Sequence, residues 1–158
     1  MIKLIECPRD AMQGIPDFID TAIKAAYINQ LLEVGFDTID FGSFVSPKAI
    51  PQMRDTAEVL SLLDLHNSKS KLLAIVANVR GAEEALLFPE IDYLGFPLSL
   101  SETFQQRNTK ASIAEALNSV EEKQNHCESW WLSLRKNWSN LELKLYRFLI
   151  RLAWRLLN

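Results

Sequence analysis

The sequence has few of the features that mark secreted, membrane-spanning or nucleic-acid-binding proteins. Its 158 residues include only two cysteines, Cys7 and Cys127, so no disulfide framework is expected and a reduced, cytoplasmic setting is favoured. No run of about eighteen uncharged apolar residues is present, which argues against a transmembrane helix. The N-terminus lacks a basic stretch followed by a long apolar run, so no signal peptide is expected. The net charge of −3 gives no reason to expect a nucleic-acid partner.

Glycine and proline are missing from residues 128–158, although the earlier residues contain five glycines and six prolines. All four tryptophans lie in this last part. Residues 1–127 hold 11 Lys and Arg against 18 Asp and Glu, whereas residues 128–158 hold 6 against 2. We therefore predict two regions, 1–127 and 128–158, with the boundary near Cys127–Glu128.

The first region alternates between strand-like and helix-like segments. Asp20 is placed to cap one helix and Gly35 to end it. Alternation of this kind predicts an α/β fold with about four βα units and parallel strands. The predicted strands are 2–6, 36–41, 71–78 and 91–96, and the predicted helices are 20–34, 54–65, 81–88 and 112–127.

The last region predicts an amphipathic helix that begins at Ser139, where Glu142 completes a capping box. Four cationic residues follow at spacings of three and four and so form one stripe along the helix: Lys144, Arg147, Arg151 and Arg155. The rest of the helix surface is a wide apolar face. Three interpretations stay open: packing on the first region, self-association of the chain, or contact with an anionic membrane. The membrane ranks last because the stripe is narrow.

Polar residues follow each predicted strand. Because parallel strands share one carboxyl edge, Arg9–Asp10, Gly42–Ser43, Asn78 and 99–102 are expected to meet there. A carboxylate such as that of Asp10 suits a hard divalent cation. The neighbouring guanidinium of Arg9 can stabilise an enolate or a developing alkoxide. The alternative is a surface ion pair between Arg9 and Asp10.

Four motifs then occur in the order found in one family. PRDAMQ (8–13) resembles the PRDGLQ signature of the DRE-TIM metallolyases, and IDFGSFVSPKAIPQMRDTAEVL (39–60) resembles the SFVSPKxxPQM segment of the 3-hydroxy-3-methylglutaryl-CoA lyases. ANVRG (77–81) and SETFQQRN (101–108) are similar to that family's PNxKG and SExFxxxN loops. The resemblance covers about residues 2–127 and implies the N-terminal half of a TIM barrel, whereas residues 128–158 do not resemble the family.

The resemblance implies roles for particular residues. Asp10 would bind the metal, Mg²⁺ or Mn²⁺, while Arg9 would polarise the substrate carbonyl and Gln13 would lie near both. Asp40 falls where the lyases carry a catalytic glutamate, so its carboxylate is one methylene shorter.

Ser43, Asn78, Ser101 and Glu102 match loop positions that face the acyl-CoA substrate. The implied reaction is a retro-Claisen cleavage of 3-hydroxy-3-methylglutaryl-CoA to acetyl-CoA and acetoacetate.

Some expected parts of the family's site do not occur. The family's His-x-His metal ligands have no match, since the two histidines, His66 and His126, are far apart. A complete barrel also needs about 200–250 residues. A frameshift after Cys127 is the leading explanation, with a truncated form as the alternative. A related metal-dependent aldolase or acyl synthase, and a catalytically silent half barrel that self-associates, stay open as other functions.

Overall fold

A four-stranded parallel sheet organises the computed structural model, which describes residues 2–118. Its strands are β1 (Ile5–Glu6), β2 (Thr38–Ser43), β3 (Lys71–Ile75) and β4 (Tyr93–Gly95), in the spatial order β1-β2-β3-β4. Each neighbouring pair is parallel. The predicted α/β fold with four parallel strands is therefore confirmed.

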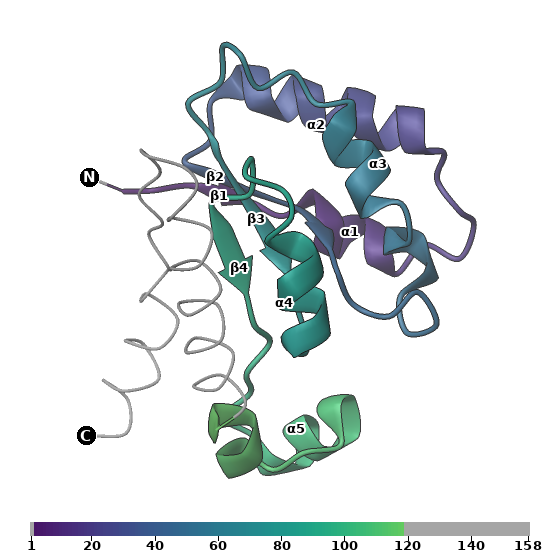
Figure 1. Cartoon of the computed structure of the whole chain (residues 1–158), viewed down its shortest axis with the longest axis vertical. Coiled ribbons are helices and arrows are strands. Elements are labelled where there is room, and N and C mark those ends of the chain that lie inside the picture. Colours follow the sequence, from purple (N-terminus) through teal and green to yellow (C-terminus); the bar gives the residue numbers. More distant parts are fainter. Residues whose placement is uncertain (1, 119–158) are drawn as a thin grey trace.

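Helices connect the strands (Figure 1). They are α1 (Pro8–Gln13), α2 (Thr21–Val34), α3 (Thr56–Ser61), α4 (Val79–Ala85) and α5 (Glu102–Thr109), with a short 3₁₀ helix, η1 (Pro51–Met53), before α3. Residues 113–118 are helical as predicted. The rest of the helix predicted at 112–127, the region 128–158 and the helix predicted from Ser139 lie outside the described residues.

The ends of α2 follow the local signals in the sequence. The Asp20 side chain accepts a hydrogen bond from the backbone N–H of Ala22 at 2.8 Å. At the other end Gly35 adopts a left-handed conformation with φ of 81°, which glycine reaches without steric cost. Both predicted ends of this helix are confirmed.

The apolar core lies between the sheet and the helices that cover it. Strand β3 shows the arrangement, because Leu72 and Ala74 are buried while Leu73 and Ile75 are half-buried. A continuous apolar run such as 71–78 is typical of a strand covered on both faces, and here one face is buried while the other is partly covered. The other buried members of the core include Ile28, Leu32, Ile39, Phe41, Val59, Leu60, Ala82 and Ala85.

Two helices occupy segments that were predicted as loops. Helix α1 begins at Pro8, whose fixed φ suits the first turn of a helix. Helix α5 begins after Ser101, whose Oγ accepts a hydrogen bond from the N–H of Phe104 at 3.4 Å. Helices of six and eight residues are too short to show a repeating apolar pattern, so periodicity missed both.

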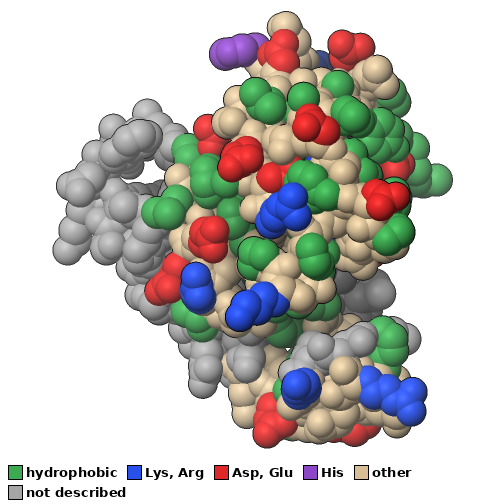
Figure 2. Space-filling view, turned by 90° about the vertical axis from the view of Figure 1, so that its right-hand side faces the viewer, with side chains coloured by type: hydrophobic (Ala, Val, Ile, Leu, Met, Phe, Trp, Pro, Cys, Tyr) green, Lys and Arg blue, Asp and Glu red, His purple; other side chains and the backbone are tan. Residues whose placement is uncertain are grey.

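The surface in Figure 2 mixes apolar and acidic side chains on the face that it shows, with a few basic ones between them. Among residues 2–118, no helix combines the length and the apolar character that a membrane crossing requires.

Candidate active site

Helix α1 follows β1 after a single residue and carries three of the predicted site residues. Arg9 and Gln13 are four residues apart, so they lie on one face of the helix. The helix packs against β2 and η1, which brings that face over the middle of β2. These residues were predicted in a loop, and their helical spacing is what places them together.

Arg9 forms a close ion pair with Asp40 of β2, 31 residues away in the sequence. Its Nε lies 3.1 Å from both carboxylate oxygens, and its Nη2 lies 2.5 Å from Oδ2. The Asp40 side chain is 6% exposed and that of Arg9 is 13% exposed. Paired hydrogen bonds of this kind fix the guanidinium plane as well as its position.

The remaining Arg9 nitrogen links this pair to Asp10 and Gln13. Nη1 donates to Gln13 Oε1 at 2.9 Å and to Asp10 Oδ1 at 3.2 Å. Gln13 Nε2 also donates to Asp10 Oδ1, at 3.2 Å. The structure therefore brings Arg9, Asp10, Gln13 and Asp40 into one cluster.

Asp10 is the outward-facing member of this cluster, with a side chain that is 64% exposed. Two carboxylates and one guanidinium leave a formal charge of −1, which favours a bound cation. A carboxylate oxygen is a ligand that Mg²⁺ prefers, and Mg²⁺ often binds through one or two carboxylates while keeping several waters. Asp10 thus fits as one ligand of a divalent cation, although residues 2–118 contain no group of three acidic, histidine or cysteine side chains that could enclose one.

Burial and charge act against each other at the ion pair. Desolvation, together with the negative charge of Asp10, raises the pKa of Asp40, while the hydrogen bonds and the positive charge of Arg9 lower it. The net result is a pKa above the usual aspartate value. Burial lowers the pKa of Arg9, but the hydrogen bonds and charge of Asp40, with Asp10, raise it overall. Arg9 is consequently a permanent cation, whereas Asp40 holds its proton to higher pH than a solvated aspartate does.

Cys7 directly precedes α1 and is exposed, although free cysteine is among the most commonly buried residue types. Partial desolvation and the negative charge of Asp40 raise the pKa of its thiol. The thiol is therefore protonated near neutral pH and is a poor nucleophile.

Ser43 is the last residue of β2 and Asn78 follows β3 at the same end of the sheet, but neither side chain bonds to the cluster. The Ser43 hydroxyl donates to the carbonyl oxygen of Ile75 at 3.2 Å, inside the sheet. The Asn78 side chain caps α4 by accepting from the N–H of Gly81 at 2.9 Å. Both side chains shape the backbone of this edge.

Ser101 and Glu102 follow β4 and also make local contacts. Ser101 caps α5, and Glu102 Oε2 accepts from the N–H of Ile113 at 3.2 Å. Their predicted contact with substrate stays a prediction.

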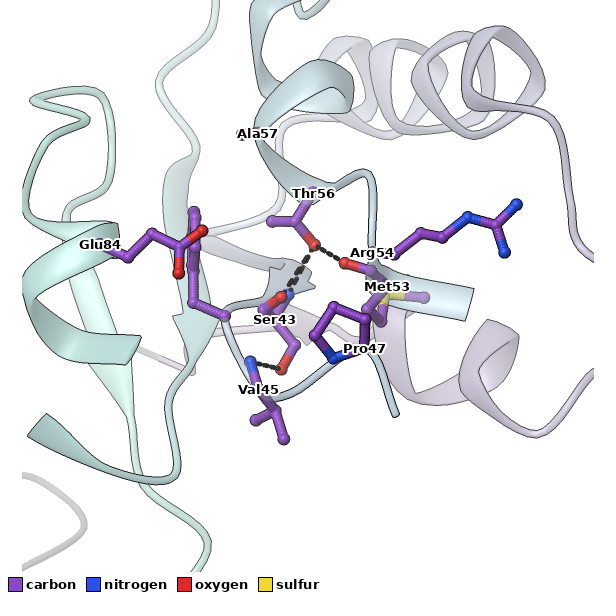
Figure 3. Close-up of a pocket in the computed structure, with 9 residues that line it drawn as sticks. Ser43, Val45, Pro47, Met53, Arg54, Thr56, Ala57 and Glu84 are labelled. Carbon is purple, nitrogen blue, oxygen red and sulfur yellow. Dashed lines mark hydrogen bonds between the residues drawn. The ribbon is translucent and has the colours of Figure 1, made fainter. Parts of the chain in front are cut away.

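A small cavity lies between the connection that follows β2 and helix α4 (Figure 3). Its volume is about 60 Å³, and its lining includes Ser43, Thr56 and Glu84. Sites for drug-sized ligands are about 300–1,000 Å³, so this cavity cannot enclose an acyl-CoA. It is separate from the cluster around Arg9, because none of the four cluster residues lines it.

Sequence reasoning missed a buried polar group beside the site. Lys24 is only 2% exposed, and its Nζ lies 2.7 Å from Asp55 Oδ1. One signal was available, because Lys24 lies one helical turn before Ile28 and therefore on the buried face of α2.

No family model matches the sequence. A hydroxymethylglutaryl-CoA lyase of Bacillus subtilis is 35% identical over 128 residues, covering 81% of this chain and 42% of that protein. The cytoplasmic 3-hydroxy-3-methylglutaryl-CoA lyase of Rattus norvegicus is 32% identical over 122 residues, covering 77% of this chain and 35% of the relative. Most of this chain is related to the hydroxymethylglutaryl-CoA lyases. It spans about two-fifths of the length of the relatives it matches.

Solved lyase structures agree with this relationship. An HMG-CoA lyase of Acinetobacter baumannii, in complex with coenzyme A and 3-methylmalate, matches with a TM-score of 0.74 and 32% identity, over 82% of this chain and 42% of that one. The Bacillus subtilis lyase also matches with a TM-score of 0.74, at 34% identity, over 81% of this chain and 43% of that one. The four parallel strands and their helices thus correspond to part of an HMG-CoA lyase barrel.

Proposed function

We propose that this chain carries the carbonyl-polarising and metal-binding part of a hydroxymethylglutaryl-CoA lyase. The observation that carries the proposal is the cluster in which Arg9 binds Asp40 through two nitrogens while Asp10 faces outward. The relationship to the lyases supports the substrate class, an acyl-CoA with a 3-hydroxyl group. A cytoplasmic location belongs to the same proposal: a relative named as cytoplasmic supports it, whereas other relatives are named as mitochondrial.

The reaction needs negative charge to be stabilised on the thioester oxygen. A base removes the hydroxyl proton, and the adjacent carbon–carbon bond then breaks. Acetoacetate is released, and the electron pair of the broken bond stays on acetyl-CoA as its enolate. Protonation of the enolate carbon then yields acetyl-CoA. The guanidinium of Arg9 can stabilise this negative charge, because it stays cationic and because Asp40 fixes the orientation of its plane.

Asp10 and Gln13 complete the arrangement. Asp10 would hold a divalent cation, Mg²⁺ or Mn²⁺, which when bound supplies Lewis-acid polarisation and lowers the pKa of the substrate hydroxyl. Gln13 orients the Asp10 carboxylate by donating to Oδ1. Its own oxygen accepts from Arg9, so the amide orientation is fixed by both neighbours.

The test is acetoacetate release from 3-hydroxy-3-methylglutaryl-CoA by the full chain, with Mg²⁺ or Mn²⁺ added. We expect Asp10→Asn to lower kcat by about a hundredfold to a thousandfold, because removal of an electrostatic stabiliser of the transition state typically costs two to three orders of magnitude. Asp64→Asn is the matched control, since Asp64 is an exposed aspartate that accepts a hydrogen bond from the N–H of His66.

Three other outcomes contradict the proposal. Activity that survives Asp10→Asn would remove Asp10 from the site. Release of a different product from a related thioester would indicate a metal-dependent aldolase or acyl synthase. No turnover at any metal concentration would favour a catalytically silent, self-associating half barrel.

A further inference from the structure

The connection between α1 and α2 is tied to the rest of the molecule by one buried side-chain amide, that of Gln52 in η1. Gln52 Nε2 donates to the carbonyl oxygens of Ile15 and Asp17 at 3.1 and 2.9 Å. Its Oε1 accepts from the N–H of Ile19 at 2.9 Å. All three partners lie in the five residues 15–19, so one amide sets the path of this connection.

Gln52 is in turn held by a buried ion pair. Lys24 Nζ donates to the Gln52 carbonyl oxygen at 2.5 Å and to Asp55 Oδ1 at 2.7 Å. The second Asp55 oxygen accepts from the Thr21 hydroxyl at 2.7 Å. The Phe18 ring, whose centroid lies 4.0 Å from Nζ, belongs to the same connection. The network therefore joins the connection to η1 and to the start of both α2 and α3.

Stability alone does not account for this network. Burying a charged pair costs about as much desolvation energy as the pair returns, and apolar side chains of similar volume are often as stable. Hydrogen bonds with fixed partners instead select one geometry. The segment selected here begins two residues after Gln13 and one residue after Gly14, which ends α1.

Helix α1 depends on neighbours for its placement because it has only six residues. Its first turn is held by the Arg9–Asp40 pair. Its last turn leads directly into Ile15, whose N–H donates to Met12 O and whose carbonyl accepts from Gln52. Asp10 lies between these two attachments.

We propose that Gln52 is a positioning residue for Asp10, acting through the 15–19 connection, with the Lys24–Asp55 pair holding Gln52 in turn. This inference rests on the proposed function, in which Asp10 binds a divalent cation. Loss of the Gln52 amide lets the last turn of α1 move and weakens metal binding, while the core beneath the helices stays intact.

The first measurement is Mn²⁺ affinity of the full chain, by electron paramagnetic resonance of free Mn²⁺. Gln52→Met keeps the side-chain length and removes three hydrogen bonds, and we expect its Mn²⁺ Kd to rise about tenfold, the loss usual for partners that orient metal ligands. The matched control is Asn29→Leu. Asn29 also holds a loop with its amide: its Nδ2 donates to Leu62 O at 3.1 Å and its Oδ1 accepts from the N–H of Asp64 at 2.9 Å, in the segment that follows α3.

A second measurement needs no metal. Hydrogen exchange at the amides of Ala11 and Ile15, which donate to Cys7 O and Met12 O, reports opening of α1. We expect these two amides to exchange about ten times faster in Gln52→Met and at the wild-type rate in Asn29→Leu. The contribution of global unfolding to exchange is determined from urea titrations of each variant and subtracted. If Gln52→Met does not fold, Gln52→Glu is measured in its place. The glutamate keeps the acceptor for the N–H of Ile19, but it loses the donor to the carbonyl oxygens of Ile15 and Asp17 and places an oxygen against them.

The outcomes separate the two proposals. If Asp10→Asn loses Mn²⁺ binding while Gln52→Met keeps wild-type affinity and exchange, the positioning role is overturned and the proposed metal site stands. If wild type and Asp10→Asn bind Mn²⁺ equally, the proposed function fails. The exchange rates at Ala11 and Ile15 then decide whether Gln52 positions α1.

Discussion

At the scale of single residues, the adjacent charges of Arg9 and Asp10 have different environments. The contact between them is 3.2 Å long and the Asp10 side chain is 64% exposed, so their mutual attraction contributes little. Arg9 instead directs two of its nitrogens at the buried Asp40. The surface ion pair considered from sequence therefore exists, but it is the weaker of two pairs and leaves Asp10 open to solvent.

The raised pKa of Asp40 predicts a pH-dependent stability. The folded state binds this proton more tightly than the unfolded state does, so the stability gained from protonated Asp40 is complete below the usual aspartate pKa of about 4. It is lost as pH rises through the higher folded value. We expect the free energy of unfolding of wild type, relative to Asp40→Asn, to fall over this window and to stay constant at higher pH.

Urea titrations of both proteins between about pH 3 and pH 7 provide the measurement. Asp64→Asn again serves as the control, because Asp64 is exposed. A relative stability that rises with pH would mean that attraction to Arg9 outweighs desolvation at Asp40, contrary to this prediction.

At the scale of helices and strands, two glycines allow close packing beside the site. Strand β2 has an irregular register with β3 at Asp40 and Gly42, and a Cβ on Gly42 would lie 2.5 Å from Thr56 Cγ2. At Gly81, an added Cβ would overlap the carbonyl oxygen of Phe44. Helix α4 can approach the end of β2 only because Gly81 has no side chain.

Gly81→Ala is accordingly expected to destabilise the protein by about 2 kcal/mol, as overpacking against an immovable backbone atom does. Gly14→Ala is the control, because a Cβ at Gly14 meets no atom within 4 Å and its φ of −88° is ordinary. The control is expected to change the free energy of unfolding by less than about 0.5 kcal/mol in urea titrations. Equal effects of the two substitutions would contradict the packing explanation.

At the scale of the whole molecule, β1 and β4 each pair with one strand in the part of the chain that the structure describes. Leu4, just before β1, is 63% exposed, and Ile2 and Ile5 are exposed as well. Exposed apolar edge strands favour pairing between chains. This supports the self-association that the sequence left open.

Leu4→Lys is expected to weaken self-association about tenfold, because a lysine on an edge strand opposes pairing with another strand. Leu87→Lys is the control, since Leu87 is 65% exposed and follows α4, away from β1. Sedimentation velocity over a range of protein concentrations measures both variants. If the sedimentation coefficient of wild type does not depend on protein concentration, the chain does not self-associate and the prediction is contradicted.

The amino-acid sequence by itself determined the four strands, the ends of α2 and the set Arg9, Asp10, Gln13 and Asp40, because apolar periodicity, helix caps and signature motifs are local. Only the tertiary structure decided that Arg9 pairs with Asp40, since that contact joins residues 31 positions apart. It also decided that Asp10 faces solvent and that Lys24 is buried on Asp55. The burial of a side chain and its contacts with residues far away in the sequence depend on how the helices pack on the sheet, and no local sequence pattern encodes that packing.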